Sequence, residues 1–276
     1  DMGITHVIRG DDHINNSPRQ INILKALGAS TPRYAHVPMI LGPDGQKLSK
    51  RHGAASVMEY RDMGYLPEAV LNYLVRLGWS HGDQEIFSLD EMTELFDLDG
   101  CNKAPSAINP SKLIWLNKHY LKTLDPIHVA RHLSWHLGQL GIDPSEGPQL
   151  ADVVQAFAER SDTLHDMAQA AIFLYREFEQ YDAKAANKHL TAAAGEPLRR
   201  LHEALAALSE WRAGPIHEAV KMVAEAGGLA LGKVAQPLRV AVSGTAISPP
   251  IDVTLELLGR RRSLTRIERA LAFIEG

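Results

Sequence analysis

After residue 60, apolar residues recur at the 3.6-residue spacing of α-helices, and this pattern constrains the fold more than any other feature. One stripe contains Leu66, Ala69, Val70, Tyr73, Leu74 and Leu77, which lie at i, i+3, i+4, i+7, i+8 and i+11. Similar stripes follow up to Ile274, without the apolar and polar alternation that is typical of strands. We therefore expect the carboxyl-terminal half of the chain to consist of helices.

The first sixty residues show a different pattern. Residues 4–8 are apolar and β-branched, which predicts a buried strand. A capping serine, a proline and a glutamine at Ser17–Gln20 predict a helix that runs to about Leu27. Residues 36–41 then predict a second strand. A strand, a helix and a strand in this order are typical of one unit of a parallel α/β sheet.

Charge is distributed unevenly along the chain. The formal net charge is −4, which does not indicate nucleic-acid binding. However, residues 1–53 and residues 230–276 each carry seven basic and four acidic side chains, while the middle of the chain is acidic. Two weakly basic ends could hold one polyanion at two places, or the asymmetry is random surface variation.

Composition excludes several classes of protein. The single Cys101 excludes an internal disulfide and a cysteine-rich zinc site, and it is typical of a reducing cytoplasm. No apolar run approaches the roughly 18 residues that a membrane-spanning helix needs. The first residues have neither the basic nor the apolar region of a signal peptide.

Two groups of residues near the expected sheet suggest chemistry. The loop Lys47–Arg51 holds three cations and a serine, which suits a phosphate that is displaced during a reaction; the alternative is a solvated surface loop. Arg9 ends the first strand, where it could grip a carboxylate or a phosphate. Asp11 and Asp12 could hold magnesium, a ribose or a ligand amine, or they cap a turn and pair with Arg9.

Several longer segments carry a family resemblance. The segments HVIRGDDH, NNSPRQINILKALG, YAHVPMILGPDGQKLSKRHGA, GYLPEAVLNYLVRLGWSHGDQEIFSL, KLIWLNKHYL and AQPLRVAVSG occur in this order along the chain. Together they resemble the class I aminoacyl-tRNA synthetases, specifically the bacterial-type glutamyl-tRNA synthetases. The resemblance covers essentially the whole chain.

The resemblance assigns roles to the residues of the amino-terminal part. Lys47–Arg51 is similar to the KMSKS signature loop, where Lys50 would stabilise the charge on the ATP phosphates, with help from Lys47 and Ser49. Arg9 matches the arginine that holds the glutamate carboxylate. Met39 and Ile40 match positions whose backbone meets the adenine. Asp11 stands where the family usually has glutamate, which leaves its role open.

The carboxyl-terminal part resembles an all-helical anticodon-binding region. Arg160 aligns with an arginine that discriminates between anticodons. A second set aligns with anticodon contacts near the end: Gln236, Arg239, Ser248, Pro249 and Ile251. Polar groups and an apolar wedge suit bases that are splayed out of a stack, although each residue could also be an ordinary surface side chain. Arg260, Arg261 and Arg262 would attract the RNA backbone, or they are simply solvated.

The expected fold is therefore the α/β remnant of a Rossmann-type catalytic domain followed by an all-α region. Residues 1–58 would belong to the catalytic domain, residues 59–124 to a helical connecting domain, and residues 125–276 to the anticodon-binding region, with one or two subdomains. The HIGH signature and the acceptor-binding insertion of the family are absent from the sequence. Half of an ATP site cannot align both reactants, so we expect the isolated chain to be unable to form glutamyl-adenylate.

The function that the resemblance implies is glutamate–tRNA ligation. It implies L-glutamate, ATP, Mg²⁺ and tRNA(Glu) as substrates, cofactor and partner, no zinc site, and a cytoplasmic monomer that does not bind membranes. One alternative is a non-catalytic RNA-binding module. Another is glutaminyl-tRNA synthetase, whose β-barrel anticodon domains the helical stripes argue against. The sequence leaves open whether tRNA(Gln) is also charged.

Overall fold

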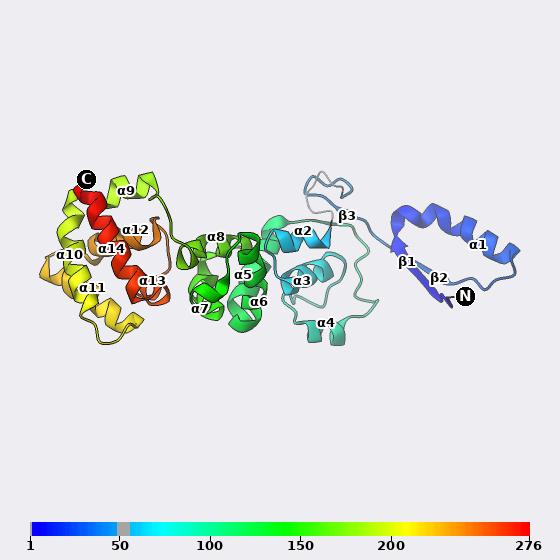
Figure 1. The fold of residues 1–276 in the computed structure, drawn as a ribbon. Helices are drawn as coiled ribbons and strands as arrows, with labels where there is room; N and C mark the ends of the chain where they lie inside the picture. Colours follow the sequence, from blue (N-terminus) through cyan, green and yellow to red (C-terminus); the bar gives the residue numbers. More distant parts are fainter. Residues whose placement is uncertain (1, 49–55) are drawn as a thin grey trace. The chain divides into compact units, whose positions relative to one another are not determined.

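The computed structural model describes residues 2–48 and 56–276 (Figure 1). The chain divides into two compact units, Asp1–Tyr120 and Leu121–Gly276. Each unit is described by itself below. Among the described residues, no helix is both long enough and apolar enough to cross a membrane.

The first unit opens with the expected strand, helix and strand. Strand β1 (His6–Gly10) leads through a short 3-10 helix (Asp11–Asn16) into helix α1 (Ser17–Ala26), and β2 (Arg33–Val37) follows. The two strands pair in parallel along their full length. Because a parallel pair requires a crossover, α1 supplies the connection, and the predicted α/β unit is confirmed.

The second strand differs from the prediction for residues 36–41. Strand β2 already ends at Val37. Pro38 follows, and because proline has no backbone N–H it cannot continue a ladder of hydrogen bonds. The chain then forms a separate two-residue strand, β3 (Ile40–Leu41), which pairs in parallel with β4 (Ser106–Ala107). The predicted strand is therefore two short strands in two different sheets.

The rest of the first unit is helical. Its helices are α2 (Val57–Asp62), α3 (Pro67–Gly78), α4 (Leu89–Leu95) and α5 (Pro110–Thr123), the last of which continues into the second unit. The stripe predicted from Leu66 to Leu77 is confirmed except at Leu74: the other members are buried, whereas Leu74 is 45% exposed. Helix α4 begins with a capping box in which Ser88 and Glu91 exchange hydrogen bonds.

A buried polar network joins the helices of the first unit. The Tyr120 hydroxyl on α5 lies 2.7 Å from both Asn72 Oδ1 on α3 and the carbonyl oxygen of Phe87. Asn72 in turn donates from Nδ2 to the carbonyl of Glu85 at 2.9 Å. Burial raises the pKa of Tyr120 to about 12. The network fixes the segment between α3 and α4 against α5.

The α/β part of the first unit buries little of its apolar surface. The side chains of Ile8, Ile23 and Leu27 are 53%, 60% and 75% exposed. Helix α1 buries only Ser17. Burial of apolar surface is the main source of folding free energy, so this part contributes little to the core of the unit.

The second unit begins with three helices that we call the first layer. They are α6 (Pro126–Gln139), α7 (Leu150–Phe157) and α8 (Leu164–Tyr175). Helix α6 packs against both α7 and α8. The loop between α6 and α7 holds a short 3-10 helix, Pro144–Glu146.

Six further helices form what we call the second layer. They are α9 (Ala183–His189), α10 (Ala192–Ala206), α11 (Ala213–Ala226), α12 (Leu231–Ser243), α13 (Ile251–Leu258) and α14 (Arg260–Glu275). Helices α10, α12 and α13 all contact α14, and α11 contacts α10, α12 and α13. Residues 121–276 form helices and no strands, which confirms the all-α prediction.

Candidate functional site

Arg9 lies at the carboxyl end of β1 and is held by polar side chains. Its guanidinium donates to Ser17 Oγ at 2.8 Å and to His36 Nε2 at 3.4 Å. Ser17 Oγ and His36 Nε2 also lie 3.0 Å apart, and the Tyr34 ring lies 5.3 Å from the guanidinium. Within the described residues, the contacts of Arg9 thus orient its side chain through neutral groups, which leaves its positive charge available to an anion.

Lys47 lies at the start of the predicted phosphate loop. Its Nζ is 3.0 Å from Asp12 Oδ2, and the lysine side chain is 62% exposed. The hydrogen bond from Lys47 lowers the pKa of Asp12. Ser49 and Lys50, the other two predicted catalytic residues, lie outside the described residues. An exposed ion pair of this kind is weak because water screens it, so Lys47 can readily exchange Asp12 for a phosphate.

Met39 and Ile40 are half-buried beside the same loop. Ile40 pairs with Ser106 in the second small sheet. Its carbonyl oxygen accepts a hydrogen bond from the Leu48 N–H at 3.1 Å. This bond ties the base of the Lys47 loop to β3. The adenine contacts predicted for Met39 and Ile40 stay predictions.

Arg160 lies beside a groove in the second unit. It ends the 3-10 helix Ala158–Arg160 and is exposed. The groove has a volume of about 760 Å³ and lies between α7 and α13. Its walls include Gln149, Asp152, Trp211, Arg212 and Pro250. Polar, charged and aromatic side chains therefore meet in one concave surface.

Arg239 on α12 is held close to this groove. Its Nε donates to Ser248 Oγ at 3.0 Å, and a second nitrogen lies 3.5 Å from the Pro249 carbonyl. Burial and, after it, the positive charge of Arg160 lower the pKa of Arg239. The two arginines predicted from the sequence are thus brought near each other, although they are far apart in the chain.

The other predicted anticodon residues are less accessible. Ser248 is 5% exposed and Ile251 is 8% exposed, and Pro249 is also buried. Gln236 Oε1 is buried and has no hydrogen-bond partner among the described residues. Ser248 and Pro249 thus hold the Arg239 guanidinium through hydrogen bonds. The exposed apolar side chain of this loop is Ile247, at 80%.

Sequence patterns did not single out Ile247 or Trp211. Trp211 lies in the groove, where its Nε1 donates to the Leu255 carbonyl at 2.8 Å. The available signal was weak. Each is a large apolar residue in a short segment between two helices, outside the stripes that predict a core.

The arginine run at the start of α14 is mostly engaged in contacts within the protein. Arg260 donates to the Leu208 carbonyl, and Arg262 donates to the Leu174 carbonyl at 2.6 Å. Arg261 is exposed. Two of the three arginines therefore fit neither the RNA-binding nor the solvated interpretation.

The described residues do not build a metal site of their own. In residues 2–48 and 56–276, no cluster of three or more His, Cys, Asp or Glu side chains could hold a metal ion. Asp12, one of the two carboxylates considered for magnesium, is paired with Lys47.

Comparison with protein families assigns both units. A family described as "Anticodon binding domain" matches residues 128–271, and "tRNA synthetases class I (E and Q), catalytic domain" matches residues 1–115. The chain belongs to the family of this anticodon binding domain, whose match spans more than half of its residues. The predicted fold class, a catalytic remnant followed by a helical anticodon-binding region, is confirmed.

Several similar proteins bear the name of glutamate–tRNA ligase or synthetase. Glutamate–tRNA ligase 1 of Nitrosococcus oceani is 62% identical over 275 residues, which cover 100% of this chain and 59% of that protein. A solved glutamate tRNA ligase from Elizabethkingia meningosepticum, in complex with its amino acid, has a TM-score of 0.83 at 30% identity. The match covers 99% of this chain and 58% of that protein. The glutamate-tRNA synthetase of Elizabethkingia anophelis has a TM-score of 0.78 at 31% identity, with 100% and 57% covered. This chain therefore spans less than two thirds of the length of these relatives.

Proposed function

We propose that this chain is part of a glutamate–tRNA ligase and that its second unit binds the anticodon of tRNA(Glu). The observation that carries the proposal is the groove beside Arg160, which lies inside the anticodon binding domain and has Arg239 nearby. Cations, an indole ring and amide groups in one groove suit unstacked RNA bases and their phosphates. The 62% identical relative bears the name of the ligase.

The proposed reaction has two steps. The carboxylate of L-glutamate attacks the α-phosphate of ATP, which gives glutamyl-adenylate and diphosphate. A ribose hydroxyl of the terminal nucleotide of tRNA(Glu) then attacks the glutamyl carbonyl, and AMP leaves. Negative charge grows on the phosphates in the first step, where nearby fixed cations lower the barrier most.

The roles in the first unit follow from this chemistry. Arg9 would hold the glutamate carboxylate, because neutral partners already orient its guanidinium. Lys50 and Lys47, with Ser49 shaping the loop, would bind the ATP phosphates. The backbone of Met39 and Ile40 would contact the adenine. Mg²⁺ would arrive on the ATP phosphates, since the described residues offer no cluster to hold it and Mg²⁺ commonly binds through substrate phosphates.

In the second unit, some residues would contact the anticodon and others would support those residues. Arg160 and Arg239 would contact the bases or phosphates of the anticodon, together with the Gln236 side chain. Ser248, Pro249 and Ile251 would shape the surface that the bases meet. We also propose that the parent ligase is a cytoplasmic monomer.

Glutaminyl-tRNA synthetase is the less favoured alternative. Its anticodon domains are β-barrels, whereas residues 121–276 of this chain form helices only. The other alternative is a non-catalytic RNA-binding module. It applies to the isolated chain, because we propose that this chain by itself does not form glutamyl-adenylate. An assay of ATP–diphosphate exchange with the isolated chain tests this point, and measurable exchange would contradict it.

Binding to tRNA transcripts tests the main proposal. We expect the chain to bind a tRNA(Glu) transcript more tightly than a transcript with a substituted anticodon. Arg160→Gln should reduce this preference by about tenfold or more, because one good side-chain contact to a base discriminates by about 1–3 kcal/mol. Arg199→Gln, a surface arginine on α10, is the matched control. Equal binding of both transcripts by the unchanged protein would overturn the proposal.

A further inference from the structure

The two layers of the second unit are joined by one short segment. Helix α8 ends the first layer at Tyr175, and α9 begins the second at Ala183. The groove that contains Arg160 lies between α7 of the first layer and α13 of the second. Its width therefore depends on whatever holds the two layers together.

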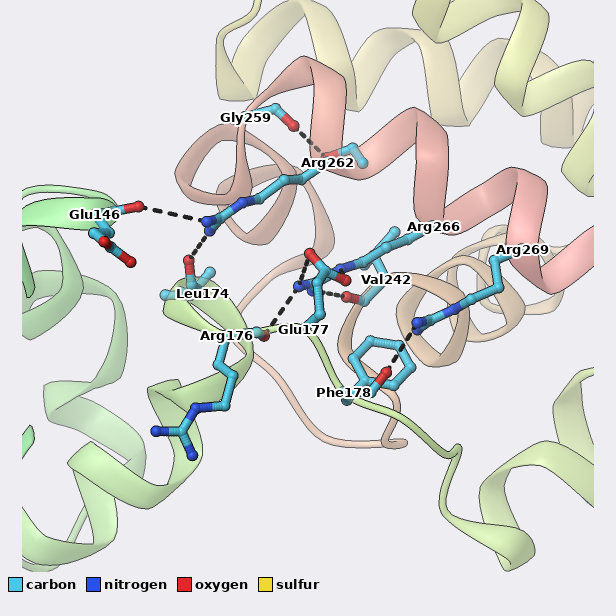
Figure 2. Close-up of polar contacts among 11 residues, drawn as sticks. Glu146, Leu174, Arg176, Glu177, Phe178, Val242, Gly259, Arg262, Arg266 and Arg269 are labelled. Carbon is cyan, nitrogen blue, oxygen red and sulfur yellow. Dashed lines mark hydrogen bonds and ion pairs between the residues drawn. The ribbon is translucent and has the colours of Figure 1, made fainter. Parts of the chain in front are cut away.

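Three arginines of α14 form hydrogen bonds with the end of α8 and the start of this segment (Figure 2). Arg262, Arg266 and Arg269 lie at i, i+4 and i+7, so they share one face of the helix. Figure 2 shows all three side chains reaching from α14 toward the residues between Leu174 and Phe178. We call these three residues the arginine clamp.

Arg266 is the centre of the arginine clamp. Its side chain is 1% exposed, and it forms a two-pronged ion pair with Glu177, with both N–O distances at 3.0 Å. It also donates to the carbonyl oxygens of Val242 at 2.6 Å and Arg176 at 3.2 Å. A buried guanidinium is costly unless its donors are satisfied, and here its three nitrogens all have partners.

The outer two arginines extend the same contact in both directions. Arg262 donates to the carbonyl of Leu174 at 2.6 Å and lies 3.4 Å from that of Glu146, both in the first layer or its loops. Arg269 donates to the Phe178 carbonyl at 2.9 Å, and its guanidinium lies 4.0 Å from the centre of the Phe178 ring. The arginine clamp thus holds the backbone from Leu174, in the last turn of α8, to Phe178.

Contacts across the groove hold its two walls only weakly. Arg160 belongs to the first layer and Arg239 to the second, and after burial the positive charge of Arg160 also lowers the pKa of Arg239. These like charges repel each other, and the carboxylates of Asp152, Glu159 and Glu256, which also line the groove, offset part of this repulsion. Helices α7 and α13 also meet over only a small surface.

We propose that Arg262 and Arg266 are positioning residues for anticodon recognition: they fix α14 to the segment after α8 and so hold Arg160 and Arg239 at the separation that the anticodon requires. The inference rests on the proposed function. It assigns these two arginines a role in specificity although neither lines the groove.

Distances between spin labels test the restraint without RNA. One label is placed on α8 (Gln169→Cys) and one on α11 (Lys221→Cys), both exposed and outside the groove, in a Cys101→Ser background. We expect one narrow distance distribution, which Arg266→Gln and Arg262→Ala broaden or shift. Arg200→Gln, whose ion pair lies within α10, should leave the distribution unchanged. An unchanged distribution in a folded Arg266→Gln variant, with folding checked by circular dichroism, would overturn the proposal.

Transcript binding tests the consequence for specificity. We expect Arg266→Gln and Arg262→Ala to lower the preference for tRNA(Glu) over the anticodon-substituted transcript by about tenfold, because misplacement by 1 Å can cost much more than this. Affinity for the substituted transcript should change less than twofold, and Arg266→Lys should recover part of the preference. A purely structural role would weaken both transcripts equally, which would contradict the inference.

The two measurements separate the failure of this inference from that of the proposed function. If the unchanged protein shows no preference for tRNA(Glu), the proposed function fails, and the role in recognition fails with it. If the preference exists but does not respond to Arg266→Gln or Arg262→Ala, only the inference about the arginine clamp fails.

Discussion

Two glycines in and near the first layer differ in what a methyl group would meet. A Cβ added to Gly147 would overlap the Tyr175 ring, whose hydroxyl donates to the Pro148 carbonyl at 3.1 Å. A Cβ added to Gly138, inside α6, would meet nothing within 4 Å. The absence of a side chain is therefore required at Gly147 but not at Gly138.

Substitution by alanine should separate these two positions. We expect Gly147→Ala to lower the free energy of unfolding by about 1–3 kcal/mol, because Tyr175 or the loop must move to make room. Gly138→Ala should raise it by about 0.5–1 kcal/mol, because alanine is the better helix former. Urea unfolding followed by circular dichroism measures both, and a stabilising Gly147→Ala would show that the loop is not packed as described.

Tyr120 makes the stability of the first unit sensitive to alkaline pH. Its folded pKa is about 12, above the ordinary value of 10.0. Between these values the unfolded chain loses the proton first, so the free energy of unfolding falls as the pH rises. Burial also raises the pKa of Tyr73, which lies in the same unit and contributes in the same direction.

Replacing Tyr120 by phenylalanine should therefore have two effects. At neutral pH, Tyr120→Phe should lower the free energy of unfolding by about 1–3 kcal/mol, because the Phe87 carbonyl loses a buried donor. Between pH 10 and pH 12, the decline of stability with pH should be shallower than in the unchanged protein. Denaturant titrations at pH 7, 10 and 11 compare the two proteins, and equal slopes would contradict the assigned pKa.

At the scale of elements, the pairing of α14 with the segment after α8 should depend on acid pH. Burial alone would raise the pKa of Glu177, but its hydrogen bond with Arg266 and the charges of Arg266, Arg269 and Arg262 leave it below the ordinary value of 4.5. The folded state thus favours the carboxylate. Its contribution is present above the unfolded pKa and is lost as the pH falls through the folded pKa.

Glu177→Gln removes this dependence. We expect the variant to be less stable than the unchanged protein at pH 7, because the buried Arg266 loses its counter-ion. The difference should shrink as the pH falls below about 4.5 and the carboxylate of the unchanged protein takes up a proton. Thermal unfolding from pH 3 to pH 7 measures the difference, and a difference that is independent of pH would argue against the ion pair.

At the scale of the whole molecule, the buried apolar side chains are distributed unevenly. Helix α1 buries Ser17 alone, whereas α12 buries seven of its residues, including Val234 and Leu238. Local opening is easiest where few apolar contacts are lost. The α/β part at the amino terminus and the helices of the second layer should therefore differ in stability.

Hydrogen exchange should report this difference directly. We expect backbone amides of β1, α1 and β2 to exchange orders of magnitude faster than those of α10 and α12 at the same pH, because protection grows with the free energy of opening. Mass spectrometry of peptides after timed exchange in D₂O measures both regions in one sample. Equal protection would mean that β1, α1 and β2 are stabilised by contacts that the structure does not show.

The sequence by itself determined the features that depend on local spacing. The stripe from Leu66 to Leu77, apart from Leu74, and the parallel α/β unit were predicted correctly, because helical and strand periodicity act between near neighbours. The motifs also identified the family. The strand at residues 36–41 was predicted wrongly, since Pro38 divides it and the partner of β3 lies more than sixty residues away.

Only the tertiary structure decided which distant residues meet. Arg266 and Glu177 are 89 positions apart, and nothing in their local pattern marks them as an ion pair. Ser248 likewise supports Arg239 instead of facing solvent. Such contacts depend on how amphipathic helices pack across the whole unit, and sequence spacing determines the apolar face of a helix but not its partner. The groove, the arginine clamp and the nearness of Arg160 to Arg239 follow from that packing.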